Sequence, residues 1–265
     1  MQRRKFLSAS LAASALALTR KASPQTAAAT GGREYYQLRR YFLQNGAQTK
    51  LTESYFNDAL VPALTRMGMG PVGAFKLDYG PETPTYYLLI PARSVETLVT
   101  VDLKLADDAE FLKVADSFWN APASAPAYVR VDSQLMAAFE GWPRITPPPG
   151  SATKAKRIFQ LRTYESPSDR DHVRKVEMFH KGEFDYFKNA GFHPVFFGDT
   201  LVGPRMPNLT YMLSLDKLED MNKEWEAFGS DPGWKKLSAS DRYAFESIVS
   251  NITNLVLSPL AASQI

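Results

Sequence analysis

Two short segments each place an arginine two residues before a tyrosine, and this pair of side chains could bind a polar ligand. Residues 37–41 read QLRRY, and residues 160–164 read QLRTY. A guanidinium presents a fork of donors to a carboxylate or carbonyl, and a phenol hydroxyl beside it can donate or accept. The candidate ligand-binding residues from these segments are Arg39, Tyr41, Arg162 and Tyr164.

Both segments alternate as a β-strand does, so each arginine shares a strand face with its tyrosine. We expect the apolar face, which carries Leu38 and Leu161, to lie under helices and the arginine face to line a barrel. Buried arginines need acceptors. An internal polar network that fixes the register of two sheets would supply them. A pair of pseudo-symmetric sites for an anionic or carbonyl-bearing ligand is the alternative, and both interpretations stay open.

A second candidate lies on a predicted helix, where Glu177, His180 and Glu183 follow one another at helical spacing. On a helical wheel His180 falls in the middle of the apolar stripe, and Asn57 takes the same place 123 residues earlier. We therefore add Asn57 and His180 to the candidate ligand-binding residues, at a pocket between helix and sheet. No second histidine follows one turn after His180, so we expect no metal site.

The common cofactor motifs are missing or misplaced. Residues 68–73 spell G-x-G-x-x-G, but they end a predicted helix and open a strand. Dinucleotide binding requires the opposite order, because the phosphate sits at the N-terminus of a helix. The chain also has no cysteine, which excludes disulfides, thiolate metal sites and a cysteine nucleophile. We expect no cofactor.

The two segments belong to an internal repeat with an offset of 123 residues, since Gly68 also returns as Gly191. One offset held by two separated blocks indicates a duplicated unit. Hydrophobic periodicity predicts strand, helix, strand, strand, helix and strand in each copy. In the first copy these cover residues 35–43, 51–67, 72–79, 85–90, 94–118 and 133–141. In the second they cover 158–165, 171–190, 194–202, 209–215, 217–228 and 247–257.

This order of elements is typical of the ferredoxin-like fold, whose sheet carries helices on one face only. The other face needs a cover, and a second copy of the sheet supplies one. We predict an α+β fold in which two tandem ferredoxin-like βαββαβ units pack sheet to sheet as an intramolecular α+β barrel. The units span residues 35–145 and 157–257, and the proline-rich residues 146–156 link them.

The first 29 residues are typical of an export signal. Arg3 and Arg4 open an R-R-x-F-L pattern, and the apolar run at 6–18 is shorter than the roughly 20 residues of a membrane-spanning helix. We expect residues 1–29 to be a twin-arginine signal peptide. We therefore expect the mature protein to be periplasmic or extracellular, with no stable membrane anchor after cleavage. The remaining chain holds 26 basic and 28 acidic residues and no nucleic-acid motif, so we expect no nucleic-acid partner.

The repeated segments resemble the NIPSNAP family of the dimeric α+β barrel superfamily. The family's opening strand reads E-L-R-x-Y, which residues 37–41 and 160–164 match with Gln in place of the acid. Residues 231–234, DPGW, resemble its D-P-x-W segment, and the resemblance covers residues 35–257. It implies the barrel fold and leaves the reaction open, because the superfamily includes oxygenases, isomerases, haem enzymes and binding proteins.

From these observations we expect an exported protein that binds a small molecule in a helix–sheet or barrel pocket. The alternatives are a cofactor-independent oxygenase or isomerase, by analogy with the superfamily, and a scaffold protein without chemistry. Pairing of the barrels into a homodimer is left open.

Overall fold

The computed structural model describes residues 32–265, so the expected signal peptide at 1–29 lies outside the described residues. Within them the chain forms eight strands. The first half contributes β1 (Tyr35–Phe42), β2 (Gly73–Tyr79), β3 (Thr85–Ala92) and β4 (Arg130–Ala138). The second half contributes β5 (Ile158–Glu165), β6 (His193–Val202), β7 (Asn208–Leu215) and β8 (Asn251–Pro259). Every paired strand is antiparallel to its neighbour.

A long helix follows the opening strand of each half and contains a wide π-helical turn. It consists of α1 (Ala47–Ser54), the turn η1 (Tyr55–Leu60) and α2 (Val61–Arg66) in the first half. Its counterpart consists of α6 (Asp169–Met178), the turn η2 (Phe179–Glu183) and α7 (Phe184–Asn189). Gly68 and Gly191 follow these helices at φ values of 74° and 104°. Only glycine adopts such values without strain, which explains why both helices end there.

Shorter helices complete each half. The first has α3 (Val95–Val99), α4 (Val101–Ala106) and α5 (Ala109–Trp119), and the second has η3 (Leu218–Asp220), α8 (Met221–Ser230), α9 (Pro232–Ser238) and α10 (Phe245–Ile248). Side-chain caps stabilise the N-termini of α3, α5 and α9. Ser94 accepts from the Thr97 amide, Asp108 from the Phe111 amide, and Asp231 from the Gly233 and Trp234 amides. Such caps satisfy amides that the first helical turn leaves free.

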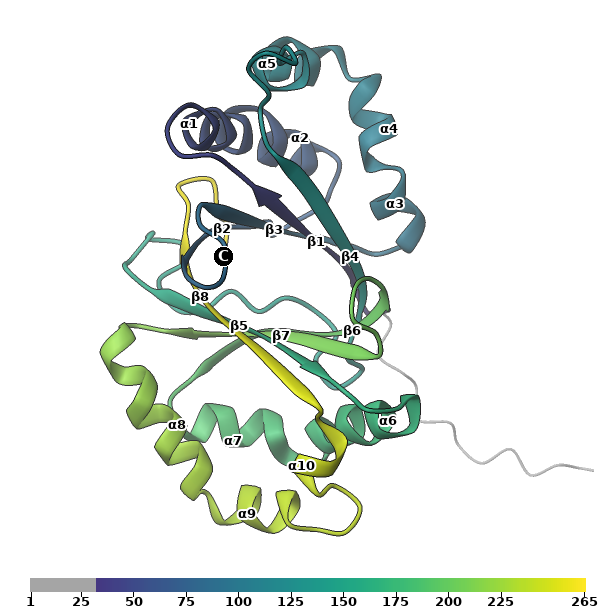
Figure 1. Ribbon diagram of the computed structural model, residues 1–265, viewed down its shortest axis with the longest axis vertical. Helices are drawn as coiled ribbons and strands as arrows, with labels where there is room; N and C mark the ends of the chain where they lie inside the picture. The colour runs from purple at the N-terminus through teal and green to yellow at the C-terminus, as the bar shows by residue number, and fades with distance from the viewer. Residues whose placement is uncertain (1–31) are drawn as a thin grey trace, which may run out of the picture. The chain divides into compact units, whose positions relative to one another are not determined.

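The strands close into one barrel in the order β1-β3-β2-β8-β5-β7-β6-β4. The halves meet where β2 pairs with β8 and where β4 pairs with β6. Figure 1 shows the helices of the first half, at the top, and those of the second half, at the bottom, with the strands between them. The predicted α+β fold, two βαββαβ units joined sheet to sheet as an intramolecular barrel, is therefore confirmed.

Three apolar cores stabilise this arrangement. One fills the barrel interior and includes Tyr36, Phe75 and Phe159. The others lie between the sheet and the helices of each half. The last residues of the chain return to the barrel, where the Gln264 amide donates to the Val72 carbonyl at 2.8 Å and the Ile265 side chain is fully buried in the interior core.

The predicted orientation of the opening strands is wrong. Leu38 and Leu161 belong to the barrel interior, whereas Tyr41 and Tyr164 belong to the cores under the helices. Strand alternation says which residues share a face but not which layer covers that face. Both layers here are apolar, so the apolar character of Leu38 could not distinguish the barrel interior from the helix–sheet layer.

Candidate functional site

The helix positions of Asn57 and His180 also differ from the prediction. Both side chains are exposed: Asn57 Nδ2 donates to Asp58, while His180 Nε2 accepts from the Gly141 amide at 3.0 Å. The buried positions fall one residue earlier, at Phe56 and Phe179, which are fully buried. The buried face before η2 carries His172 and Lys175, so polar residues on that face, rather than the geometry of the helix, led the apolar stripe to be placed one residue away.

His180 has a structural role instead. Its Nδ1 lies 2.9 Å from the Val176 carbonyl, and its Nε2 accepts from the Gly141 amide. An imidazole that accepts at Nε2 donates at Nδ1, so both ring nitrogens are satisfied within the protein. The ring ties the helix of the second half to the segment after β4 of the first half.

The opening-strand arginine of the first half lies at the mouth of a helix–sheet cleft. The Arg39 side chain is only 8% exposed, and its Nη1 lies 3.0 Å from Oδ1 of Asp102 on α4. Nη2 donates to the other oxygen, Asp102 Oδ2, at 3.1 Å, and Nε donates to Gln37 Oε1 at 3.0 Å. This forked contact fixes the guanidinium plane and leaves part of its donor capacity unused.

The cleft has a volume of about 200 Å³ and mostly aromatic walls. Tyr55 and Phe118 stack with ring centroids 3.8 Å apart, and Tyr55 Oη accepts from the Trp119 indole at 3.0 Å. Tyr41 and Tyr128 complete the wall near Arg39. The flat faces of these rings suit a flat apolar ligand, and Arg39 and Asp102 offer a donor and an acceptor at one edge.

The charges of this cleft are fixed by its surroundings. Burial alone would lower the pKa of the Arg39 guanidinium, but Tyr41 and Asp102 beside it raise that pKa above its ordinary value. Burial raises the pKa of the Tyr41 phenol, against the effect of Arg39. Arg39 is therefore a permanent cation and Tyr41 a neutral hydroxyl at physiological pH. Because Asp102 balances Arg39, the pair carries no formal net charge.

The corresponding arginine of the second half is half-buried and contacts two aromatic side chains. Arg162 Nη2 donates to Tyr164 Oη at 3.2 Å, and the Tyr164 hydroxyl lies 2.7 Å from that of Tyr211. The Trp225 ring covers the guanidinium at 4.3 Å, while the Trp225 indole donates to Gln160. Trp225 follows Asp102 by the same 123 residues. In the second half, the Trp225 indole thus occupies the place that the Asp102 carboxylate has in the first half.

A buried ion pair lies beside Arg162. Lys175 Nζ donates to Glu183 Oε2 at 2.6 Å, and the two side chains are 0% and 1% exposed. Burial lowers the pKa of Lys175 and raises that of Glu183, each against the attraction of its partner. The residues 123 positions earlier are Thr52 and Leu60, also fully buried. The ion pair is therefore a feature of the second half only.

The structure brings Arg39 and Tyr41 together at one cleft, and it brings Arg162 and Tyr164 together in a hydrogen-bonded network. Asn57 and His180 join neither. Sequence reasoning missed Asp102, Tyr55 and Trp119, which complete the first cleft. The only sequence feature that could have pointed to Asp102 as a site residue is the 123-residue offset that relates it to Trp225. That offset does not predict contact between Asp102 and Arg39.

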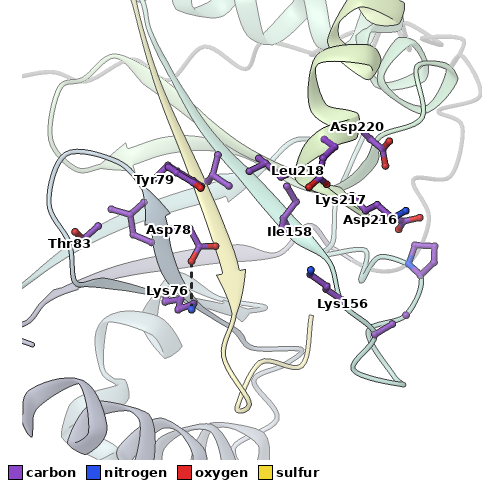
Figure 2. Close-up of a pocket in the computed structure, with 16 residues that line it drawn as sticks. Lys76, Asp78, Tyr79, Thr83, Lys156, Ile158, Asp216, Lys217, Leu218 and Asp220 are labelled. Carbon is purple, nitrogen blue, oxygen red and sulfur yellow. Dashed lines mark ion pairs between the residues drawn. The ribbon is translucent and has the colours of Figure 1, made fainter. Parts of the chain in front are cut away.

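A wide groove of about 1360 Å³ lies beside β2 and β8 (Figure 2). Its charged side chains have both signs, including Lys76, Lys156, Asp78 and Asp216. Lys76 lies 3.7 Å from Asp78, a long contact between an exposed lysine and a half-buried aspartate. None of the predicted site residues lines the groove. Its width and scattered charges differ from the enclosed walls and few convergent polar groups of a small-molecule site.

Two further properties concern residues 32–265 alone. Among these residues, no three His, Asp or Glu side chains gather closely enough to hold a metal ion. No helix in the same range has the length and apolar character needed to cross a bilayer.

Comparisons with known proteins agree with this architecture. Residues 156–264 match the model of the NIPSNAP family. A candidate monooxygenase from Fusobacterium nucleatum subsp. nucleatum has a similar structure, with a TM-score of 0.54, 8% identity, and 86% of this chain and 93% of that chain covered. A candidate monooxygenase from Lactobacillus acidophilus NCFM matches with a TM-score of 0.53 and 10% identity, over 88% of this chain and 97% of that chain. An anthrone oxidase-like protein matches with a TM-score of 0.51 and 13% identity, over 86% of this chain and 91% of that chain.

At these identities the structural matches establish the fold alone. A search of curated proteins found no matching relative.

Proposed function

We propose that this protein, whose residues 156–264 match the model of the NIPSNAP family, binds a small aromatic molecule in the helix–sheet cleft of its first half. Arg39 is the residue that orients the ligand. The observation that carries this proposal is the difference between the halves. Arg39 lies at an open cleft lined by aromatic rings, whereas Arg162 is covered by Trp225.

The charges of the cleft indicate the polar group of the ligand. Arg39 and Asp102 neutralise each other, so an anion would have to displace the Asp102 carboxylate. A neutral ligand can keep the pair intact if its oxygen accepts from Arg39 and its hydroxyl donates to Asp102. The Asp102 side chain is 61% exposed, which allows it to adjust to such a guest. We therefore propose a phenol, or a carbonyl compound with a neighbouring hydroxyl.

Calorimetry with 2-naphthol, a neutral two-ring phenol, tests this proposal. We expect binding to the wild type and a loss of affinity of about tenfold or more in Arg39→Gln, since a hydrogen bond from a charged donor contributes about 1.5–3 kcal/mol. Arg162→Gln is the matched control, because the same change falls on a covered side chain. It should leave the affinity of the folded protein unchanged. Equal affinity in wild type and Arg39→Gln would exclude Arg39 as the orienting residue.

The exposed carboxylate of Asp102 supports a second candidate, proton transfer at a carbon next to a carbonyl. Arg39 would bind the carbonyl oxygen and stabilise the enolate, and Asp102 would take the proton from one carbon and return it to the same or another carbon. Hydrogen–deuterium exchange of 2-tetralone in D2O, followed by NMR, tests this step. Wild type should accelerate exchange and Asp102→Asn should not. Equal rates in the two proteins would remove proton transfer from consideration and leave binding alone.

We also propose that the protein is exported through the twin-arginine pathway to the periplasm or beyond. The support is the sequence of residues 1–29, with Arg3, Arg4 and the short apolar run that follows them. This part of the proposal is independent of the cleft, because it concerns delivery of the folded protein rather than its ligand.

A further inference from the structure

One end of the barrel interior is polar and hollow, in contrast to the apolar core that fills the remainder. Along β1 the inward positions change from Leu38 to Arg40, and along β5 they change from Leu161 to Thr163. A cavity of about 280 Å³ lies at this end, and we call it the mouth cavity. It is separate from the Arg39 cleft, which lies on the other face of β1.

The charged groups at the mouth cavity already balance one another. Arg40 and Arg205 line the cavity, and each guanidinium has a carboxylate partner. Arg40 Nη2 lies 2.5 Å from Asp132, and Arg205 Nη1 lies 3.3 Å from Glu165. These two ion pairs carry no formal net charge, so an ionic guest would have to break one of them or remain unpaired at a cost. The cavity therefore suits a neutral guest.

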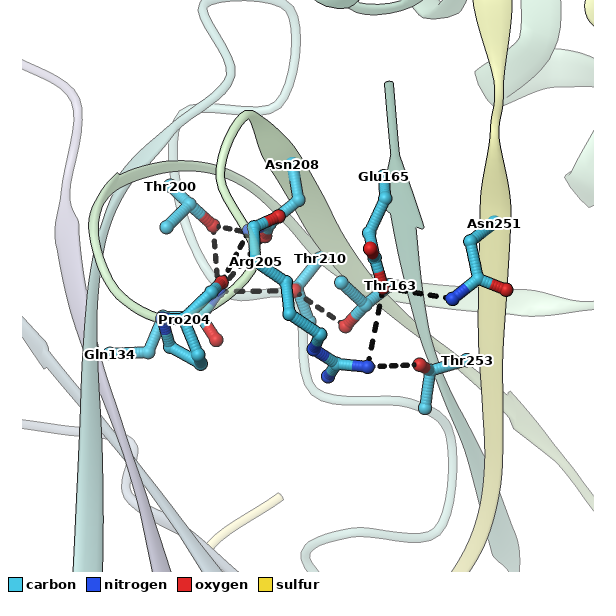
Figure 3. Close-up of polar contacts among 10 residues, drawn as sticks. All are labelled: Gln134, Thr163, Glu165, Thr200, Pro204, Arg205, Asn208, Thr210, Asn251 and Thr253. Carbon is cyan, nitrogen blue, oxygen red and sulfur yellow. Dashed lines mark hydrogen bonds and ion pairs between the residues drawn. The ribbon is translucent and has the colours of Figure 1, made fainter. Parts of the chain in front are cut away.

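The polar side chains beside the cavity form one hydrogen-bonded chain, and its direction is fixed from its far end (Figure 3). Asn208 Nδ2 donates to the carbonyls of Pro204 and Arg205 at 2.9 and 3.0 Å. Its Oδ1 therefore accepts from the Thr200 hydroxyl, at 2.7 Å. Because Thr200 donates its proton to Asn208, it must accept from Gln134, whose Nε2 lies 2.7 Å away. The nitrogen of the Gln134 amide thus faces this network.

The same chain ends on a hydroxyl in the cavity wall. Gln134 Nε2 carries a second proton, which it donates to Thr210 Oγ1 at 3.2 Å. Thr210 is fully buried, and the only acceptor that its own hydroxyl meets among residues 32–265 is Thr163 Oγ1, at 2.9 Å. Thr210 therefore donates to Thr163, which lines the cavity. The Thr163 hydroxyl accepts from the protein, so its own proton is free for a guest.

A second free donor lies next to Thr163. Thr253 Oγ1 accepts from Arg205 Nη1 at 2.9 Å, and its own proton meets no acceptor within residues 32–265. Thr163 and Thr253 are directly opposite each other on β5 and β8, and both line the cavity. Opposite side chains on neighbouring strands have Cβ atoms about 4.5–5.5 Å apart, so one guest oxygen can lie between the two hydroxyls. The mouth cavity thus presents two convergent donors.

We propose that the mouth cavity is a second binding site, which takes a small neutral ketone or ester with an apolar body. The carbonyl oxygen has two lone pairs, which accept from the Thr163 and Thr253 hydroxyls. The apolar body lies against the cavity floor, which is formed by Leu38, Leu161 and Leu255. The volume of about 280 Å³ is close to the lower end of the roughly 300–1,000 Å³ of small-molecule sites. This site requires neither Arg39 nor the ligand of the first-half cleft.

Calorimetry with 2-heptanone and with sodium heptanoate tests the site, because the two probes share a chain length and differ in charge. Wild type should bind 2-heptanone more tightly than heptanoate. Thr163→Val and Thr253→Val each remove one donor and keep the side-chain shape, so each should weaken 2-heptanone about two- to tenfold. Thr163→Ser keeps the hydroxyl and should bind as wild type does. Thr153→Val is the control, because Thr153 is exposed in the linker between the halves.

The infrared carbonyl stretch of bound 2-heptanone reports the two hydrogen bonds directly, because each donor lowers its frequency. Wild type should show the lowest frequency, and each valine variant should show a higher one. Thr253→Val decides the test if Thr163→Val fails to fold. The Thr163 hydroxyl satisfies the buried Thr210, whereas that of Thr253 contacts only Arg205, whose side chain is 45% exposed.

A methyl NMR spectrum locates the probe, and 2-heptanone should shift the resonances of Leu161 and Leu255. The proposal is overturned if wild type does not bind 2-heptanone, if both valine variants bind it as wild type does, or if heptanoate binds as tightly. It is also overturned if the two leucine resonances stay in place while the Trp119 indole of the other cleft responds. Loss of 2-naphthol binding in Arg39→Gln would leave these results unchanged, so the two sites can fail separately.

Discussion

The buried ion pair between Lys175 and Glu183 provides a quantitative test of how the second half is built. Replacing Lys175 by Met keeps the length of the side chain and removes its charge. Glu183, which is 1% exposed, then has no partner for its carboxylate. Breaking a buried pair in this way typically costs about 3–5 kcal/mol. The Phe179 ring, whose centroid lies 4.3 Å from Lys175 Nζ, also loses its cation–π contact, worth about 0.5–2 kcal/mol.

The double variant Lys175→Met with Glu183→Leu should recover most of that loss. It removes both charges, so no desolvated carboxylate remains, and apolar replacement of a buried pair is often neutral or stabilising. The first half supports this expectation, since Leu60 occupies the position equivalent to Glu183 and is fully buried. We expect the double variant to lie within about 1–2 kcal/mol of the wild type.

The pH dependence of the free energy of unfolding tests whether the unpaired Glu183 carboxylate causes the loss of stability in Lys175→Met. In the single variant the pKa of Glu183 in the folded state is raised by burial, with no lysine to oppose it. A raised pKa contributes stability below the unfolded value of about 4.3, and that contribution is lost as the pH rises through the folded value. The single variant should therefore approach the double variant as the pH falls from 7 toward about 4.

Urea unfolding followed by circular dichroism at several pH values measures all three proteins. Two results would refute the reasoning. One is a single variant within about 1 kcal/mol of wild type at pH 7, and the other is a double variant less stable than the single one. Because the pair lies in the second half, binding of 2-naphthol to the folded variants should be unchanged.

Three further predictions use other parts of the chain. Gly141→Ala should lower stability by about 1–3 kcal/mol in thermal melts, because a Cβ there would lie 2.8 Å from the ring of His180, which two hydrogen bonds hold in place. Burial and two nearby aspartates raise the pKa of Glu224 to about 7, so its stabilising contribution should be present below about pH 4 and lost as the pH rises to 7, and Glu224→Gln should remove this dependence. Changing Arg3 and Arg4 to Lys should retain the precursor in the cytoplasm on fractionation, and an unchanged periplasmic yield would count against export by this route.

The repeat explains why the fold could be predicted from the sequence. An offset shared by residues 37 and 68 requires two equivalent units, and their order of elements leaves one sheet face of each without helices. Covering those faces with each other follows from the burial of apolar surface. The closed barrel and the helix ends at Gly68 and Gly191 agree with that reasoning.

The site was harder to predict, for two physical reasons. The buried face of the second-half helix carries His172, Lys175 and Glu183, so a search for an apolar stripe selected the neighbouring face, which carries the exposed His180. Contact between Arg39 and Asp102 joins residues 63 apart and depends on where the short helix α4 packs. Neither a buried ion pair nor such a packing contact leaves a periodic signal in the sequence.

We propose that the first-half cleft binds a ligand and that the second half does not, because the Trp225 ring lies over Arg162 there. The indole resonances of Trp119 and Trp225 report on the two places, because each indole donates to a neighbour in its own half. A proton–nitrogen NMR titration of wild type with 2-naphthol should shift the Trp119 indole in a saturable way and leave that of Trp225 unmoved. An unmoved Trp119 at saturating 2-naphthol, or equal shifts at both indoles, would contradict the claim.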